Sequence, residues 1–349
     1  MSMKSTNNAG SEQPADSSNK EQPPAGSWAT LSFFEITVNS RTNVTAPVYA
    51  NGRQRIPVQV ELVAHDESGN RVTLTPGQLL QVKFITYETS SPPPLHISNS
   101  KGDYEYHWSV ISDIGQDAEQ EPHHPAPRGQ TVMFYVSADS VDRTVRIAAA
   151  ITSPANVLYT TNTRNPTAGE FDSWIIVDRR PPIVHQWTKL AILDSVNLIT
   201  LWNWDVDLYY IGFKNEQNEN LRLVGGEIKN AADGKSFYSW PKDGWARKSS
   251  VAYRPDYERT TSFPDATGIS FKVNDRYGLA CAARISSKSS FNIPQSSSYG
   301  YVTYYDQHGN SVPATITPST NGNTLSLGPA WLDAQTPEAS DDASPAVET

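Results

Sequence analysis

Hydrophobic and polar residues alternate with a period of two along most of this chain, and Gly, Pro, Asn and Asp interrupt the alternation at short intervals. A period of two places successive side chains on opposite faces of a β-strand, whereas an amphipathic helix requires a period of about 3.6. Residues 56–65 show this clearly, because Val58, Val60 and Leu62 fall on one face. The pattern therefore predicts an all-β protein of strands and tight turns.

The predicted strands form two groups. The first group comprises residues 32–38, 56–65, 81–88, 104–111, 130–138, 143–152 and 174–177, and the second comprises 191–201, 205–213, 221–229, 250–253, 268–273, 278–286, 299–305 and 314–316. About seven strands per group matches a β-sandwich, immunoglobulin-like or jelly-roll-like in kind. One helical turn is also expected, because Thr75 and Gln78 form a capping-box pattern around Pro76.

Two consecutive prolines, Pro181 and Pro182, separate the groups, and proline cannot donate a hydrogen bond to a sheet. We therefore expect an immunoglobulin-like sandwich over residues 28–180, a proline linker over 181–186 and a second sandwich over 187–332. Residues 1–27 and 333–349 contain too few apolar groups to offset the entropy of ordering them. Both are predicted to be disordered tails, and the second is acidic.

Charge and cysteine content narrow the range of functions. The net charge is -9 and no Lys/Arg cluster occurs, which argues against binding to nucleic acid, since phosphate recognition requires a concentrated positive field. The single cysteine, Cys281, excludes an intrachain disulfide and a Cys-rich zinc site. No cofactor or metal is expected.

The first 27 residues have no apolar run after their few basic residues, so they do not form a Sec-type signal peptide. No stretch approaches the roughly 20 apolar residues of a membrane-spanning helix, so no integral membrane segment is expected. We expect synthesis in the cytoplasm and leave release or export by another route open.

The segment NVTAPVYANGRQRIPVQVELVAHDESGNRV, which begins at Asn43, resembles the opening of bacterial immunoglobulin-like repeats of the invasin and intimin type. The resemblance covers residues 44–75 and departs from the family after Thr75. The matching residues are Ala50, Asn51, Gly52, Val58, Val60, Asp66, Gly69 and Asn70. Such domains serve as rigid spacers or receptor-binding tips on cell surfaces, so the resemblance implies an interaction role outside the cell.

Residues 202–210 carry the densest group of candidate ligand contacts. On a strand, Trp204, Val206 and Leu208 would share a core face, and Asp205, Asp207 and Tyr209 would share the opposite face. Two carboxylates about 7 Å apart on a strand suit a cation, a sugar contact or the acid and nucleophile of a glycosidase. The alternative is an ordinary pair of charges facing water, whose removal would change stability by less than about 1 kcal/mol.

Trp240 and Trp245 lie in SWPKDGWARK, which is predicted to be a loop because Pro and Gly interrupt it. Aromatic side chains on loops commonly contact sugars or protein partners. We therefore include both tryptophans among the candidate binding residues.

Residues 285–305 are rich in serine and end in alternating aromatic residues. Two arms of about ten residues each are long enough for a β-hairpin that enters a membrane in an oligomeric pore. The candidate insertion residues are Ser286, Ser290, Phe291, Ser297, Tyr299 and Tyr301. A polar loop followed by an ordinary strand is the alternative, because Pro294 interrupts the first arm.

The chain contains no serine-hydrolase, zinc-protease, P-loop or dinucleotide-binding motif. The sequence therefore favours a non-enzymatic bacterial binding or structural protein that acts in surface or extracellular interaction, with a protein or glycan surface as partner and oligomerisation left open. The alternatives are a water-soluble β toxin that oligomerises on membranes and a carbohydrate-active enzyme that uses Asp205 and Asp207.

Overall fold

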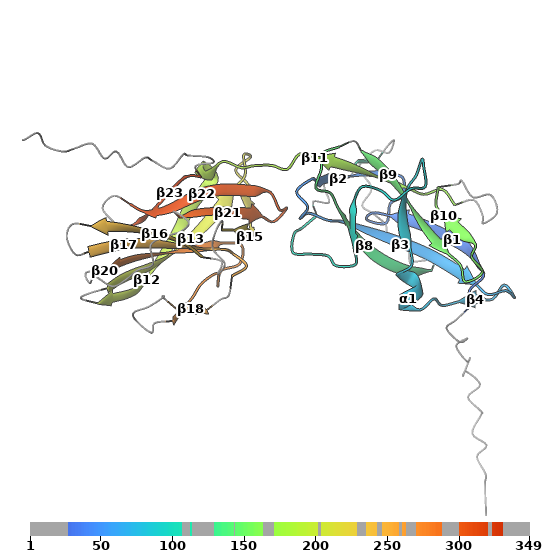
Figure 1. Ribbon diagram of the computed structural model, residues 1–349, viewed down its shortest axis with the longest axis horizontal. Coiled ribbons are helices and arrows are strands. Elements are labelled where there is room, and N and C mark those ends of the chain that lie inside the picture. Colours follow the sequence, from blue (N-terminus) through green and yellow to red (C-terminus); the bar gives the residue numbers. More distant parts are fainter. Residues whose placement is uncertain are drawn as a thin grey trace, which may run out of the picture.

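The computed structural model describes residues 27–106, 112–113, 129–142, 144–162, 171–201, 204–228, 235–242, 246–257, 260–262, 270–287, 300–319 and 323–330. These residues form two β units that lie end to end along the long axis of the molecule (Figure 1). The predicted all-β fold class is confirmed.

The first unit contains two packed sheets. One sheet has the order β1 (Thr30–Thr37), β3 (Ile56–His65), β8 (Gln130–Ser137) and β6 (His96–Ser98), with β4 (Arg71–Val72) paired to β3. The other has the order β10 (Leu158–Thr160), β9 (Val145–Thr152), β11 (Ile175–Arg180), β2 (Val44–Tyr49) and β7 (Ser112–Asp113), with β5 (Lys83–Thr86) paired to β9. Val58, Val60 and Leu62 are fully buried between the sheets, so the predicted core face of β3 is confirmed.

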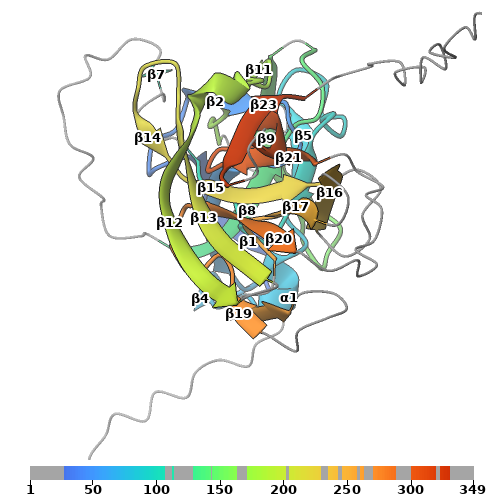
Figure 2. The same ribbon diagram turned by 90° about the vertical axis from the view of Figure 1, so that its left-hand side faces the viewer.

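The second unit is built on one long sheet. Its strands are β12 (Leu190–Leu201), β13 (Trp204–Lys214), β20 (Ala280–Ser287), β17 (Ala246–Tyr253) and β16 (Lys235–Lys242), with β14 (Asn220–Leu221) paired to β13. Figure 2 shows the first two of these as long, strongly twisted neighbours. A second sheet contains β15 (Leu223–Glu227), β21 (Tyr301–Asp306), β22 (Ser311–Pro318) and β23 (Leu325–Pro329). A two-stranded ribbon is formed by β18 (Thr260–Ser262) and β19 (Ser270–Lys272).

The centre of β13 in the long sheet is buried on both faces. Val206 and Leu208 pack with Phe271 of β19 on one face, whereas Tyr209 and Ile211 pack on the other face against the second sheet. The expectation of one core face and one polar face along β13 is therefore wrong at Tyr209, which is 6% exposed. The physical reason is that the second sheet covers the face that the alternation assigned to solvent.

Two local predictions have clear outcomes. The short helix α1 (Pro76–Leu79) is present, with the reciprocal capping bonds between Thr75 and Gln78. The segment around Trp240 is the strand β16 rather than a loop. Strand β16 lies at the edge of its sheet, where Pro241 can be accommodated because its missing N–H group need not complete a ladder.

The predicted strand at 104–111 is not formed in its described part. Residues 104–106 are irregular, and the main chain of Glu105 bonds instead to the second unit, donating its N–H to the carbonyl oxygen of Gln307 at 2.7 Å. Residues 107–111 lie outside the described residues.

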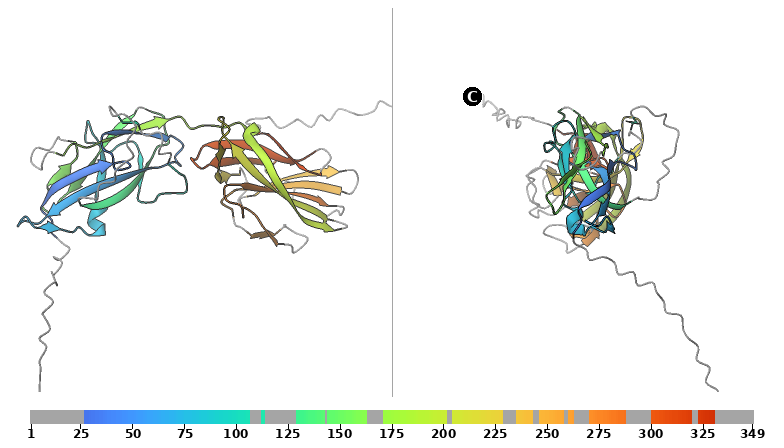
Figure 3. Two further views of the ribbon diagram at one scale, coloured as in Figure 1. Left: turned by 180° about the vertical axis from the view of Figure 1, so that it is seen from behind. Right: turned by 90° about the vertical axis from the view of Figure 1, so that its right-hand side faces the viewer.

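The proline segment between the units is hydrogen-bonded to the second unit. Figure 3 shows the connection between the two units from behind. Strand β11 ends at Arg180, and the short 3-10 helix η2 (Trp187–Lys189) follows. Between them, His185 donates its backbone N–H to the carbonyl oxygen of Ser311 at 2.8 Å, and Ser311 donates in return to that of Ile183 at 3.1 Å. These bonds fix the segment that connects the two units. Among the described residues, no helix has the length and apolar character needed to cross a membrane.

Candidate functional site

Two turns in this protein share the sequence D-x-x-G-N, and within the described residues only the second of them docks on the other β unit. The turn at residues 66–70 is exposed at Glu67 through Asn70, whereas Asp306, His308 and Asn310 of the turn at 306–310 are buried. In both turns the aspartate side chain accepts backbone N–H bonds from the residues two and four positions later. The second turn joins β21 to β22 and contacts the first unit.

The turn at 306–310, called the docked turn below, contacts the first unit at two places. Asn51 donates from Nδ2 to the carbonyl oxygen of His308 at 3.1 Å, and the Nδ1 of His308 donates to the carbonyl oxygen of Glu105 at 3.1 Å. A Cβ atom at Gly309 would lie 2.7 Å from the Cβ of Arg53, so only glycine fits against that side chain. The two units are therefore joined by close polar contacts in addition to the covalent linker.

We call the contacts between the turn at 306–310 and the first unit the joint, and Glu105 lies at its centre. Its carboxylate forms a 2.5 Å ion pair with Nη2 of Arg222, and its carbonyl oxygen also accepts from Nε2 of Gln54 at 3.3 Å. Arg222 is held in turn by Gln307, whose side-chain oxygen accepts from the backbone N–H of Arg222 at 3.2 Å. The joint thus fixes Arg222 at the border between the units.

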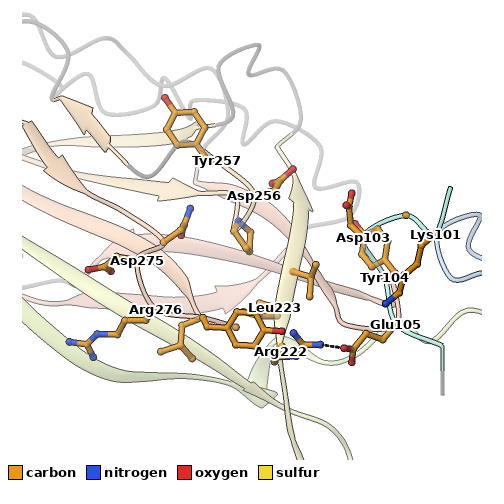
Figure 4. Close-up of a pocket in the computed structure, with 17 residues that line it drawn as sticks. Lys101, Asp103, Tyr104, Glu105, Arg222, Leu223, Asp256, Tyr257, Asp275 and Arg276 are labelled. Carbon is orange, nitrogen blue, oxygen red and sulfur yellow. Dashed lines mark ion pairs between the residues drawn. The ribbon is translucent and has the colours of Figure 1, made fainter. Parts of the chain in front are cut away.

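A cleft of about 590 Å³ opens beside the joint. Its walls come from residues 101–105 of the first unit and from residues 222–224, 255–257 and 274–279 of the second. Figure 4 shows Lys101 and Asp103 at one end and Asp275 and Arg276 at the other, with the Arg222–Glu105 ion pair between them.

Tyrosine rings line the cleft. Tyr277 is 83% exposed, and the guanidinium of Arg222 lies 4.6 Å from the centre of its ring. The turn that carries Tyr277 depends on Gly278, which has a φ of +77° and whose added Cβ would lie 2.7 Å from Cγ of Arg222. Tyr104 and Tyr257 are partly buried in the walls. The Arg222 side chain therefore supports an exposed aromatic ring on a sharply constrained turn.

Most of the charged side chains in the cleft are paired with each other or with nearby polar groups. Arg276 forms a 2.7 Å ion pair with Asp194, and Asp256 forms one of 3.3 Å with Arg254. Tyr210 donates from its hydroxyl to Asp275 at 2.9 Å, and burial together with this bond raises the pKa of Tyr210 to about 12. In the described part of the chain, Lys101 and Asp103 form no ion pair, so their charged ends are available to a ligand.

The predicted acidic pair does not form an open site. Asp205 and Asp207 both bind the guanidinium of Arg284, which donates from Nε to Asp207 at 2.8 Å and from Nη2 to both carboxylates. The Arg284 side chain is 3% exposed, and those of Asp207 and Asp205 are 16% and 41% exposed. Burial would lower the pKa of Arg284, but its bonds to the two carboxylates outweigh burial and raise it. The expectation that both carboxylates merely face water is therefore wrong, because a buried cation requires them.

The other predicted residues are scattered. Tyr209 is buried in the core of the second unit and donates from its hydroxyl to the carbonyl oxygen of Asn323 at 3.3 Å. Trp240 belongs to the edge strand β16, and Trp245 lies outside the described residues.

Of the membrane-insertion candidates, Ser286 lies in β20, where it pairs with Asp205 and Lys248, and Tyr301 lies in β21 of the other sheet. Ser290, Phe291, Ser297 and Tyr299 lie outside the described residues.

Sequence reasoning did not identify the cleft, because its walls come from loops separated by more than a hundred positions along the chain. The available signal was indirect. Tyr277 lies between two predicted strands and directly precedes Gly278, a pattern that favours a turn with an exposed ring.

No protein-family model matches this chain, and no curated protein matches it either. No bacterial immunoglobulin-like repeat is therefore detected, and the resemblance of residues 44–75 stays a prediction.

Proposed function

We propose that this protein is a non-enzymatic binding protein that acts in surface or extracellular interaction, and that it holds a glycan in the cleft between its two β units. The observation that carries the proposal is the Tyr277 ring, which is 83% exposed although it lines a cavity and is supported on one side by Arg222. An exposed ring in a fixed position supplies apolar contact area at a small entropic cost.

The dimensions of the cleft favour a small ligand over a protein surface. Its volume of about 590 Å³ lies within the range of about 300 to 1,000 Å³ that is typical of small-molecule sites. A stable protein interface instead buries about 800 Å² on each partner and is usually flatter. The terminal units of an oligosaccharide would fit a cavity of this size.

The chemistry of the walls suits hydroxyl groups. Carboxylates at Asp103, Asp256 and Asp275 can accept hydrogen bonds from sugar hydroxyls, and Lys101 and Arg222 can donate to sugar oxygens. Tyrosine faces can pack on the C–H groups of a pyranose ring. This combination of acceptors, donors and rings matches a polyhydroxylated ligand better than an apolar one.

The test is a glycan array probed with the full chain, followed by calorimetric titration with each glycan that binds. Tyr277→Ala should weaken the affinity about tenfold, because the ring contact is lost. Tyr277→Phe should retain the affinity to within about twofold, because the ring remains and only the hydroxyl is removed.

Two results would contradict the proposal. One is an affinity that is the same in wild type and Tyr277→Ala, which would place the ligand elsewhere. The other is cleavage of the bound glycan during incubation, detected as new reducing ends, which would make the protein an enzyme.

A further inference from the structure

A second cavity adjoins the cleft and differs from it in charge. It has a volume of about 390 Å³, and Lys101, Tyr104 and Glu105 line both cavities. The remaining lining residues of the smaller cavity are Arg55, Pro57, Tyr106 and Tyr135. The segment that carries Lys101 and Glu105 therefore forms a common wall, and an extended ligand can contact both cavities at once.

The smaller cavity presents two cations and one acid. Its cations are Arg55 and Lys101, and its acid is Glu105, which is already bound to Arg222 at 2.5 Å. The larger cleft contains Lys101, Arg222 and Arg276 against Asp103, Glu105, Asp256 and Asp275, which is three positive charges against four negative ones. A positive end next to a slightly negative cleft favours a ligand with one anionic unit at its end and neutral units beyond it.

The Arg55 side chain is fixed by hydrogen bonds from Nη1 and keeps further N–H groups for a ligand. Its Nη1 donates to the carbonyl oxygen of Ser100 at 2.6 Å and lies 3.5 Å from Oγ of Ser98. The guanidinium also packs on Gly102, where an added Cβ would lie 3.2 Å from Cζ of Arg55. In the described part of the chain, no hydrogen bond uses the Nε or Nη2 groups of Arg55. A fixed guanidinium edge of this kind matches the two oxygens of a carboxylate.

From this arrangement we infer that the ligand is an acidic glycan, in which a carboxylate-bearing terminal sugar of the uronic or sialic acid class binds Arg55 and Lys101 and the neutral sugars extend into the cleft beside Tyr277. This inference rests on the proposed glycan-binding function and specifies its ligand class. Polysulfated chains are disfavoured, because the net charge of -9 and the acidic larger cleft repel a polyanion.

The experiment compares glycans that differ only in the terminal unit. The probes are lactose, 3′-sialyllactose, a lactose carrying terminal glucuronic acid, and 3′-sulfated lactose, each titrated into the full chain by calorimetry. The two carboxylated probes should bind about tenfold more tightly than lactose, since a charge-assisted bidentate contact adds roughly 1.4 kcal/mol or more.

Charge-removal variants assign the site. Arg55→Gln should reduce the affinity for the carboxylated probes about five- to tenfold and leave the affinity for lactose unchanged, because Arg55 lines the smaller cavity and not the larger cleft. Lys101→Gln should reduce the affinity for the carboxylated probes by a larger factor than the affinity for lactose, because Lys101 lines the larger cleft as well. Lys83→Gln is the matched control, because it removes one exposed lysine on β5, outside both cavities. It should leave all affinities unchanged.

The possible failures are distinguishable. Equal affinity for lactose and the carboxylated probes would overturn the acidic-glycan inference and leave the proposed function intact. Tighter binding of sulfated lactose than of both carboxylated probes would also overturn it. No binding of any glycan, here or on the array, would overturn both the inference and the proposed function.

Discussion

The Nε2 atom of His185 lies 3.1 Å from Oδ2 of Asp306, and both side chains are buried, at 2% and 0% exposure. The other ring nitrogen of His185 lies 2.9 Å from Oε2 of Glu216. An imidazole can donate to two carboxylates only when both nitrogens carry a proton. His185 is therefore the counter-ion of the aspartate that shapes the docked turn, and it belongs to the segment that links the two units.

We predict that the stability of the second unit depends on the charge of His185. Burial would lower the pKa of His185, but its hydrogen bonds to Asp306 and Glu216 outweigh burial and raise the pKa above the usual 6.5. A group whose pKa is higher in the folded state contributes stability that is fully present below the unfolded pKa and is lost as pH rises through the folded pKa. The unfolding midpoint of wild type should therefore fall as pH is raised from about 6 to about 9.

The control for the pH effect is His185→Gln, which keeps a side chain able to hydrogen-bond but cannot titrate in this range. The difference in unfolding midpoint between wild type and His185→Gln, measured by scanning calorimetry, should be largest near pH 6 and shrink towards pH 9. A difference that stays constant or grows with pH would show that His185 is neutral in the folded protein. Glu216 affects stability at low pH. Burial would raise the pKa of Glu216, but its hydrogen bond to His185 outweighs burial and lowers that pKa, so the stability that Glu216 contributes is lost as pH falls through its folded pKa.

The two D-x-x-G-N turns provide a matched pair of glycine substitutions. Gly69 and Gly309 have φ values of +79° and +78°, but an added Cβ meets nothing within 4 Å at Gly69 and meets Cβ of Arg53 at 2.7 Å at Gly309. Gly69→Ala should cost about 1 kcal/mol, the usual penalty for a left-handed alanine. Gly309→Ala should cost clearly more and should increase the radius of gyration in small-angle X-ray scattering, because the joint must open.

Equal stability losses in the two glycine variants, with an unchanged radius of gyration for Gly309→Ala, would contradict this role of the joint. The two glycines have nearly the same φ, so the backbone strain of an alanine is the same in both turns. The difference between the two stability losses therefore reports the contact of Gly309 with the first unit.

The buried cation Arg284 allows a prediction about its two acidic partners. Asp207→Asn should destabilise the protein by about 2 to 4 kcal/mol, because it removes the less exposed carboxylate and leaves a buried guanidinium with reduced compensation. Asp205→Asn should cost about 1 kcal/mol or less, because its carboxylate is 41% exposed and water partly replaces it. Urea unfolding of the two variants measures the difference, and similar losses in both would contradict the arrangement.

Local features of this fold could be predicted from the sequence, whereas features that depend on distant contacts could not. The capping box at Thr75 and the core face of β3 were predicted because each is determined by residues within one turn or one strand. The strand β16 was missed because Pro241 is acceptable only at a sheet edge, and sequence alone does not reveal which strands lie at edges. The partner of Asp207 was missed because Arg284 is a neighbour only after β13 and β20 pair.

The candidate site was the least predictable part. The two D-x-x-G-N turns look alike in sequence, and what distinguishes them is that His185, Asn51 and the backbone of Glu105 bond to the second one only. These residues are more than a hundred positions away from that turn. Contacts between residues so far apart in the sequence depend on how the two units dock, and no local sequence pattern predicts that.

The connecting segment offers a final prediction, on which sequence and structure differ. Two prolines and few apolar residues favour an open linker that proteases cut near residues 179–183. In the structure, Ile183 donates its N–H to Oδ1 of Asn310 at 3.0 Å, and His185 donates to the carbonyl oxygen of Ser311 at 2.8 Å. Both amides should therefore exchange with deuterium far more slowly than unprotected amides.

The variant Asn310→Ala should affect the exchange of the Ile183 amide and of the His185 amide differently. It removes the acceptor of Ile183 but leaves the main-chain carbonyl that accepts from His185, so Ile183 should exchange faster and His185 should change much less. Hydrogen–deuterium exchange monitored by NMR measures both amides in the full chain. If both exchange at the rate of unprotected peptides in wild type, the segment is an open linker and the two units are not held together by the docked turn. If both remain protected in wild type and Ile183 alone is released by the substitution, the segment acts as a short strand added to β22, and the joint positions the cleft that it borders.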